Sequence, residues 1–175
     1  MTARLPLFFL LATALLTGCH KPAPQPGDLH EPAAQVPEAS QPPAQPGPLW
    51  VEVGGQRYTV EIADDYWERQ KGLMNRRHLP EHHAMLFIHD EEAPLAYWMK
   101  NTWIPLDILY FNSRLELVAQ QRNVQPCPKG TDCPNYPSTV PARYVLEING
   151  GQAQALNLQK GDRLTVRPDM IVPTP

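Results

Sequence analysis

The stretch that decides the fold is 107–119, DILYFNSRLELVA. It consists of two apolar runs, 107–111 and 115–119, with the turn residues Asn112, Ser113 and Arg114 between them. Short runs of this composition on both sides of a turn are typical of a β-hairpin. The stretch therefore predicts two adjacent antiparallel strands.

Similar runs, separated by turn residues, extend over the rest of 49–170. We expect strands at 50–53 and 57–62 around a Gly-Gly turn, at 85–88 and 95–99 around the acidic turn 90–92, and at 144–148 and 164–166. The proline- and cysteine-containing stretch 125–142 is expected to form a long loop. Many short strands predict a mainly β domain, a compact sandwich or barrel.

One or two short helices complete the prediction. Asp65, with Glu68 three residues later, is typical of a helix start, and Gly72 is typical of a helix end. This pattern predicts a helix over 65–71. A second short helix is expected at 152–156.

The chain begins with the features of a secretory signal. Arg4 precedes the apolar run 5–16, which at about 18 Å is too short to span a bilayer as a helix. The run ends in LTGC at 16–19, which resembles a bacterial lipobox. The resemblance implies that 1–18 is removed and that Cys19 carries acyl chains such as palmitate, which together make a durable membrane anchor. The alternative is an ordinary signal peptide that happens to contain a cysteine.

Residue 20 bears on which membrane holds the protein. In Gram-negative lipoproteins an Asp at this position favours retention at the inner membrane. Here the residue is His20. We therefore expect the outer membrane, with the protein facing the periplasm.

The segment 20–48 contains nine prolines and shows no apolar periodicity. Such composition favours an extended, disordered spacer, so 19–48 is predicted to be the lipidated cysteine and its linker. A ligand for a partner domain is the alternative. One globular domain over 49–170 and a flexible tail at 171–175 would follow.

Charge and motifs narrow the function classes. The formal net charge is −3 and no dense basic patch is present, which argues against nucleic acid as a partner. No nucleophile elbow or phosphate-binding glycine loop occurs. We expect a monomer without a cofactor.

Several runs, in order, resemble one family. They are 68–74 (ERQKGLM), 85–87 (MLF), 98–102 (WMKNT), 105–107 (PLD), 127–128 (CP), 133–137 (CPNYP), 145–147 (VLE) and 161–162 (GD). Over nearly all of 49–166 the chain is similar to the DUF192 family of bacteria and archaea. The resemblance implies a jelly-roll-like fold but no settled activity. The family usually has Gly where this chain has Ala84, so that Gly serves either a positive φ or close packing.

Lys100, Asn101, Asp107 and Glu147 form the main candidate group. Each polar side chain lies beside large apolar residues, and adjacent strands could bring them together. One interpretation is a structural ion pair that links strand ends. A second is a ligand pocket, with Trp98 in its wall and Lys100 and Asn101 as donors. A third is catalysis by Asp107 and Glu147 as acid and base.

Arg69 is a further ligand-binding candidate. A guanidinium can bind a carboxylate or phosphate with two parallel hydrogen bonds. The alternative is a solvated helix end, as for the nearby Arg76 and Arg77.

The histidines do not predict a metal site. His78 and His82 are four residues apart, but Pro80 between them weakens a helix. Neither a cysteine nor a clear carboxylate completes a ligand set around them or around His83 and His89.

Cys127 and Cys133 are predicted to form a disulfide. Export would place them in an oxidising compartment, and they are six positions apart. A redox-active pair is the alternative, but such pairs usually have Cys-X-X-Cys spacing.

These features favour a cell-envelope lipoprotein with a non-catalytic binding or accessory domain for a small polar ligand or envelope component. One alternative is a periplasmic hydrolase or lyase that uses Asp107 and Glu147 with Lys100. The other is a structural lipoprotein with only protein partners.

Overall fold

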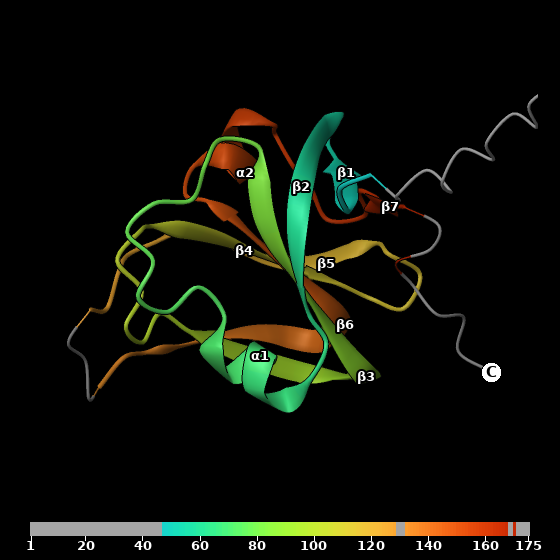
Figure 1. Ribbon diagram of the computed structural model, residues 1–175. Helices are drawn as coiled ribbons and strands as arrows, with labels where there is room; N and C mark the ends of the chain where they lie inside the picture. Colours follow the sequence, from blue (N-terminus) through green and yellow to red (C-terminus); the bar gives the residue numbers. More distant parts are fainter. Residues whose placement is uncertain (1–46, 129–131, 168–169, 171–175) are drawn as a thin grey trace, which may run out of the picture. The chain divides into compact units, whose positions relative to one another are not determined.

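The computed structural model describes residues 47–128, 132–167 and 170. In this part of the chain the elements are β1 (Trp50–Val53), β2 (Gln56–Ala63), α1 (Tyr66–Lys71), β3 (His83–Trp98), β4 (Leu106–Phe111), β5 (Leu117–Val124), β6 (Asn135–Asn149), α2 (Gln152–Ala155) and β7 (Thr165–Val166). The strands form one mixed, curled sheet in the order β5-β4-β6-β3-β2-β1-β7 (Figure 1). Only β2 and β3 pair in parallel. The predicted mainly β fold with two short helices is confirmed, and its strands belong to a single sheet.

Both predicted hairpins are present. β1 and β2 join through Gly54 and Gly55, which have φ of 58° and 77°. Two positive φ angles in a two-residue turn match the right-handed twist of the strands. β4 and β5 pair over a longer turn, in which the Asn112 side chain accepts hydrogen bonds from the backbone N–H groups of Arg114 and Glu116. β5 consequently starts at Leu117, two residues later than predicted.

The prediction of two strands around an acidic turn at 90–92 is wrong. β3 runs from His83 to Trp98 without a break and pairs with β6 on both sides of this segment. The register shifts between Ile88 and Ala93, so the acidic residues occupy an irregular, exposed part of a bent strand. The acidic residues 90–92 therefore lie at the solvent-facing bend of one strand and not in a turn between two strands.

The prediction of a loop over all of 125–142 is also wrong, because β6 begins at Asn135. Its Pro137 and Pro141 pair with β3 where the register is irregular. Proline is tolerated in sheets at such bulges because it has no N–H to contribute to the ladder. The proline-rich stretch thus extends the strand that the sequence suggested only for 144–148.

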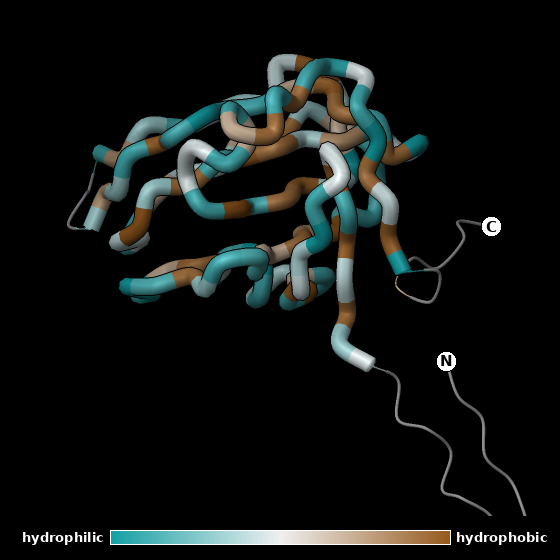
Figure 2. The backbone as a smooth tube through the Cα atoms, turned by 90° about the horizontal axis from the view of Figure 1, so that it is seen from above, coloured by the Kyte–Doolittle hydropathy of each residue, from teal (hydrophilic) through white to brown (hydrophobic). Residues whose placement is uncertain are grey.

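Side chains on the two faces of the sheet form two cores. The α2-side core includes Val51, Tyr58, Leu86, Leu109, Phe111, Leu146, Ile148, Ala153 and Leu158. The α1-side core includes Leu73, Met85, Phe87, Met99, Ile104, Ile108, Tyr110 and Val145. Neighbouring residues of β4 and β6 alternate between the two cores, as the pleat requires. Figure 2 shows the apolar residues of the strands interspersed with polar ones along the chain.

The helix predictions are confirmed within one or two residues. Asp65 caps α1, because its side chain accepts a hydrogen bond from the N–H of Glu68 at 2.7 Å. Gly72 ends α1 with a φ of 44°. α2 covers four of the five residues expected for the second helix.

The structure also shows the cysteine pair and the position where the family usually has glycine. Cys127 and Cys133 form a disulfide, with a Cα–Cα distance of 6.0 Å, as predicted. Ala84 lies in β3 opposite Val60, is 1% exposed and has no positive φ. The family's usual glycine at this position therefore corresponds to a closely packed strand residue.

The predicted signal peptide at 1–18, nearly all of the linker at 19–48 and the tail at 171–175 lie outside the described residues. No helix in the described part of the chain has the length and apolar character needed to cross a membrane.

Candidate functional site

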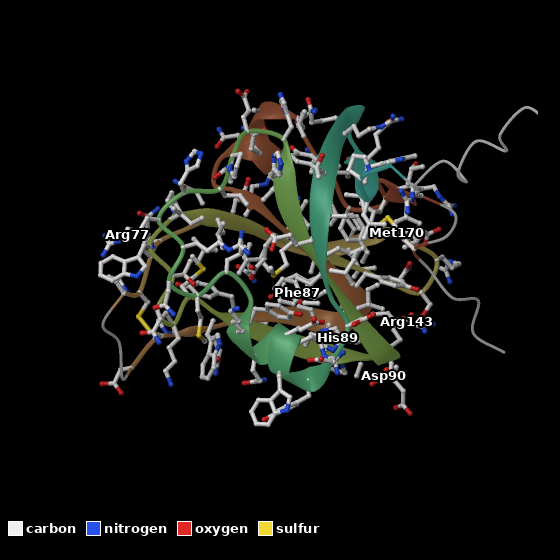
Figure 3. All side chains as sticks on the ribbon, in the orientation of Figure 1. Arg77, Phe87, His89, Asp90, Arg143 and Met170 are labelled. Carbon is white, nitrogen blue, oxygen red and sulfur yellow. A yellow bond between two sulfur atoms is a disulfide. The ribbon has the colours of Figure 1, made fainter. Side chains whose placement is uncertain are left out.

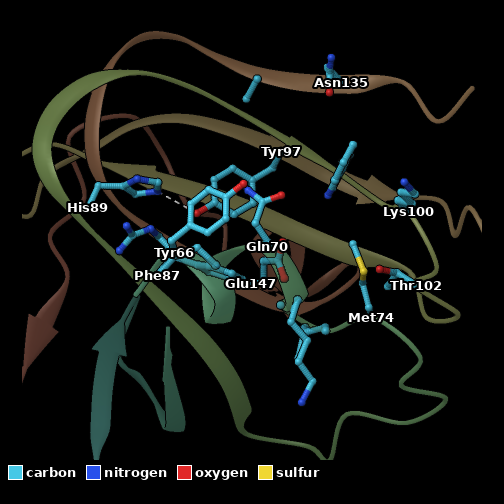
Figure 4. Close-up of a pocket in the computed structure, with 16 residues that line it drawn as sticks. Tyr66, Gln70, Met74, Phe87, His89, Tyr97, Lys100, Thr102, Asn135 and Glu147 are labelled. Carbon is cyan, nitrogen blue, oxygen red and sulfur yellow. Dashed lines mark hydrogen bonds between the residues drawn. The ribbon is translucent and has the colours of Figure 1, made fainter. Parts of the chain in front are cut away.

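A cavity of 470 Å³ opens on the α1 side of the sheet (Figure 4). Its lining comes from residues 66 and 69–74 in and after α1, from 87, 89 and 96–98 in β3, from 100 and 102 after β3, and from 135 and 147 in β6. In the close-up, His89, Phe87 and Tyr66 lie at one end and Lys100, Thr102 and Met74 at the other. The cavity is within the size range of small-molecule sites.

Glu147 is the acidic group of the cavity. It pairs with Met85 of β3 and Ile108 of β4, whose side chains belong to the α1-side core. The residue is 4% exposed, and burial raises the pKa of its carboxyl to about 8. No side chain or N–H group among the described residues donates a hydrogen bond to it, and no cation offsets the effect of burial. Neither carboxyl oxygen is a fully buried atom without a partner, so the group opens onto the cavity.

Aromatic rings surround this carboxyl. Phe87 and Tyr97 pack edge to face at 5.0 Å between centroids, and Tyr97 and Tyr110 pack similarly at 6.0 Å. Burial and the negative charge of Glu147 raise the pKa of Tyr97 and the pKa of Tyr110. Both phenols therefore remain neutral and form an apolar wall with a few fixed polar atoms.

The Tyr97 hydroxyl and His89 Nε2 share a hydrogen bond of 2.9 Å. Burial and the positive charge of Arg69 lower the pKa of His89 to about 4. His89 is therefore a neutral ring at physiological pH. In Figure 3, His89 and Phe87 lie close together beside α1.

Arg69, one of the predicted ligand donors, lines the cavity but already has backbone partners. Its guanidinium donates hydrogen bonds to the carbonyls of Asp64 and Ile88, the latter at 2.9 Å. It also lies 3.8 Å from the exposed carboxylate of Asp90. These contacts make Arg69 a link between α1 and β3.

The part of the cavity lining that reaches the surface, called the mouth below, carries basic and aromatic side chains. The Lys100 Nζ lies 5.0 Å from the centroid of the Trp98 ring. Trp98 is 40% exposed, and Tyr66, at the first position of α1, is 60% exposed. Lys71 at the end of α1 is exposed as well. Of the described ion pairs, none includes Lys71 or Lys100.

Asp107 lies on the other face of the sheet. Its carboxylate accepts backbone hydrogen bonds from Asn123 at 2.6 Å, Gly151 at 3.1 Å and Ala153 at 2.6 Å. It is fully buried and does not line the cavity. Because it pairs with Ile148, one position beyond Glu147 on β6, the two carboxylates point to opposite faces. They therefore form neither an acid–base pair nor, with Lys100, an ion-pair network.

Asn101 also lies outside the cavity lining. Its φ is 56°, a conformation that asparagine adopts more readily than most residues. Its N–H donates to the carbonyl of Cys127 at 3.0 Å, and its carbonyl accepts from the N–H of Asn75 at 2.7 Å. These bonds give Asn101 a role in holding the loop that carries Lys100.

Of the predicted group, the structure thus places Arg69, Trp98, Lys100 and Glu147 at one cavity, and Asn101 and Asp107 elsewhere. Sequence reasoning missed the aromatic and amide side chains Tyr66, Gln70, Tyr97 and Asn135, and it assigned no role to Phe87 or His89. One signal was available for part of them. The runs 68–74, 85–87, 98–102, 133–137 and 145–147, which belong to the set that carries the family resemblance, all contribute lining residues.

No group of three His, Cys, Asp or Glu side chains with the arrangement of a metal site occurs among the described residues. His83 Nδ1 lies 3.1 Å from the carbonyl oxygen of Glu81, and His82 has a positive φ of 57° in the turn before β3.

Comparisons with known proteins agree with this fold. A model of the DUF192 family, described as "Uncharacterized ACR", matches residues 49–166. A solved structure from Sinorhizobium meliloti 1021, described as a "putative transcription regulator", is 35% identical, covers 69% of this chain and 94% of its own, and has a TM-score of 0.62. A protein of unknown function from Novosphingobium aromaticivorans DSM 12444 is 33% identical, covers 67% of this chain and 82% of its own, and has a TM-score of 0.60. No curated protein shows significant similarity to the chain.

Proposed function

The chain belongs to the DUF192 family, and from that premise we propose that its β domain is a binding module for a small polar organic ligand. The ligand would occupy the 470 Å³ cavity and bond to Glu147. The observation that carries this proposal is the carboxyl of Glu147, a residue only 4% exposed, which opens onto the cavity without a hydrogen-bond donor among the described residues.

The energetics of burial support a ligand. A buried polar group without a partner costs about 1–3 kcal/mol, and more when it is charged. A ligand donor placed against Glu147 would remove this cost, and the rings of Phe87 and Tyr97 would cover its apolar part. A carboxyl with only a structural role would instead be expected to have a protein donor, as Asp107 does three times over.

The geometry favours binding over the hydrolase or lyase considered from the sequence. That alternative uses Asp107 and Glu147 together as acid and base on one substrate. Asp107 lies behind the sheet as seen from the cavity, so Glu147 has no carboxylate partner there.

We further propose that the protein is an envelope lipoprotein, lipidated on Cys19 and anchored in the outer membrane. The signal-like start, the lipobox-like LTGC and His20 support this proposal. Metabolic labelling with palmitate should mark the wild-type protein and not Cys19→Ala, and the label should fractionate with outer membranes. Labelling of both proteins, or inner-membrane fractionation of the wild type, would contradict it.

We propose that nucleic acid is not a partner of this protein. A formal net charge of −3 disfavours contact with nucleic acid phosphates. The proposed partners are the membrane lipids and the small ligand, and the protein is proposed to be a monomer.

A steric plug tests the binding proposal. Ala96 is exposed at the cavity edge, so Ala96→Trp should fill the cavity without changing a charge or the core. Ala155→Trp on α2, outside the cavity lining, is the matched control. The full chain in non-ionic detergent is screened against small polar compounds by intrinsic-fluorescence melting, because native-state binding raises the midpoint.

Compounds that bind in the cavity should raise the midpoint of the wild type and of Ala155→Trp, and leave Ala96→Trp unchanged. Equal shifts in all three proteins would place binding elsewhere. A screen without any Ala96→Trp-sensitive compound would count against a binding module.

A further inference from the structure

We propose that the ligand carries an ammonium group that pairs with the Glu147 carboxylate and an anionic group that lies at the cavity mouth near Lys71 and Lys100. The ligand class is therefore a small zwitterionic amine. This inference rests on the proposed binding function and names the chemistry of its ligand.

The floor of the cavity supplies the first argument. A buried carboxyl without a cationic partner stays protonated, and a cation placed beside it stabilises the carboxylate form. Arg69, Lys71 and Lys100 line the cavity, but none of the described ion pairs includes Glu147, and Arg69 donates to the carbonyls of Asp64 and Ile88 instead. The cationic position beside Glu147 is therefore open to a ligand, and an ammonium group fills it with charge and three donors.

The walls supply the second argument. Phe87, Tyr97, Tyr66 and Trp98 contribute aromatic surface to the same cavity. Aromatic faces attract ammonium groups and cover the methylene groups attached to them. The protein already uses this interaction at the mouth, where the Lys100 ammonium lies over Trp98.

The mouth explains why a simple cation is not the best ligand. Lys71 and Lys100 add two basic side chains to the cavity lining. Lys71 and Lys100 have no carboxylate partner among the described ion pairs. An anionic group of the ligand would bind Lys71 and Lys100. The Glu147 carboxylate would repel that group and pair with the ammonium.

Binding would release one proton from the site. Below about pH 8, Glu147 is a neutral carboxylic acid in the free protein. The complex contains the carboxylate and the ammonium, so the carboxyl proton leaves to solvent and no other bond changes. The affinity should therefore rise about ninefold from pH 6 to pH 7 and about fivefold from pH 7 to pH 8, where the carboxyl is half ionised.

The other titratable groups around the cavity do not mimic this dependence. They are Tyr66, Arg69 and Lys71 from α1, His89 and Tyr97 from β3, Lys100 after β3 and Tyr110 from β4. His89 has a pKa of about 4 and is neutral throughout this range. The pKa of Tyr97 and that of Tyr110 are raised, so both phenols are neutral throughout this pH range as well.

Four probes of equal chain length test the inference: 6-aminohexanoate, hexylamine, hexanoate and 1-hexanol. Calorimetric titration of the full chain in non-ionic detergent at pH 6, 7 and 8 should rank 6-aminohexanoate first and hexylamine second. The affinity of both amines should increase about 50-fold over these two pH units, because half of Glu147 is already ionised at pH 8. Ala96→Trp should abolish the binding.

Two variants separate the ends of the ligand. Glu147→Gln keeps the shape of the floor and should remove amine binding and its pH dependence. Lys100→Met should reduce the preference for 6-aminohexanoate over hexylamine and leave hexylamine affinity unchanged or higher. Melting curves of each variant confirm that the fold is retained.

Failure of this inference differs from failure of the binding function. If hexanoate or 1-hexanol binds in an Ala96→Trp-sensitive way and the amines do not, the cavity binds ligands but the ammonium assignment is overturned. Binding that weakens with rising pH, or that persists in Glu147→Gln, overturns it as well. If neither amine binds, the ammonium assignment also fails, and the compound screen alone then decides the binding function.

Discussion

At the residue scale, the two buried carboxyls of the α1-side and α2-side faces have opposite environments. Asp107 is saturated with backbone donors, whereas Glu147 has none among the described residues. The sequence marked both as polar residues within apolar runs but could not tell them apart, because the donors of Asp107 come from backbone at 123, 151 and 153, far from it in the chain. The pairing register assigns them to different faces, and register is not a local property of either run.

Glu147 should make stability fall as the pH rises. Its folded-state pKa is raised from 4.5 to about 8, so its contribution is complete below pH 4.5 and is lost as the pH approaches 8. His89, with its pKa lowered from 6.5 to about 4, has the opposite effect between pH 4 and 6.5. Urea denaturation should therefore give a nearly level stability to pH 6.5 and then a decline of up to about 1.4 kcal/mol per pH unit. Glu147→Gln should remove that decline, and an unchanged decline would contradict the assignment.

Asp107→Asn should destabilise the domain without affecting the cavity. The amide would direct N–H groups at backbone donors that now bind the carboxylate, so the free energy of unfolding should drop by about 3 kcal/mol. Asp162→Asn is the matched control, because Asp162 accepts one bond at an exposed turn. Chemical denaturation measures both changes. Loss of ligand binding by folded Asp107→Asn would contradict the placement of this residue outside the site.

At the element scale, local patterns predicted the hairpins and helices better than the long strands. The turn at Gly54-Gly55 and the helix between Asp65 and Gly72 are determined by local backbone angles and capping hydrogen bonds, which the sequence shows directly. β3 and β6 are long only because each follows the other through a bend, and the exposed acids and prolines of that bend resemble a turn and a loop in the sequence. The aromatic lining was missed for the same reason, since it is assembled across β3, β6 and α1.

The disulfide loop joins the element that carries Lys100, since Lys100 bridges to Cys127 and the N–H of Asn101 donates to its carbonyl. Replacing both cysteines by serine should lower the free energy of unfolding by about 2 kcal/mol, the loop-closure value for so short a span. Denaturation with and without a reducing agent measures the effect. The wild type should respond to reduction and the double variant should not. A wild type that reduction leaves equally stable would contradict this contribution.

At the scale of the whole molecule, the family runs are spread over most of 49–166, and five of the eight contribute residues to the lining of one cavity. The two cores pack on the two faces of the sheet. Residues of α1 and of the turn that follows line one side of the cavity. The proposed lipid anchor and linker would present this cavity in the periplasm. The sequence alone predicted the class of fold and six ligand-binding candidates, of which four reach the cavity. It did not assign a ligand group to each of them.

The central claim is that Glu147 anchors a ligand in this cavity, and carbon-13 NMR titration of glutamate carboxyl signals tests it most directly. The signal missing from Glu147→Gln identifies the residue. In the free wild-type chain it should titrate near pH 8, and saturation with 6-aminohexanoate should move its titration to lower pH, because the ammonium stabilises the carboxylate. A signal that titrates at the same pH with and without the amine would contradict the account.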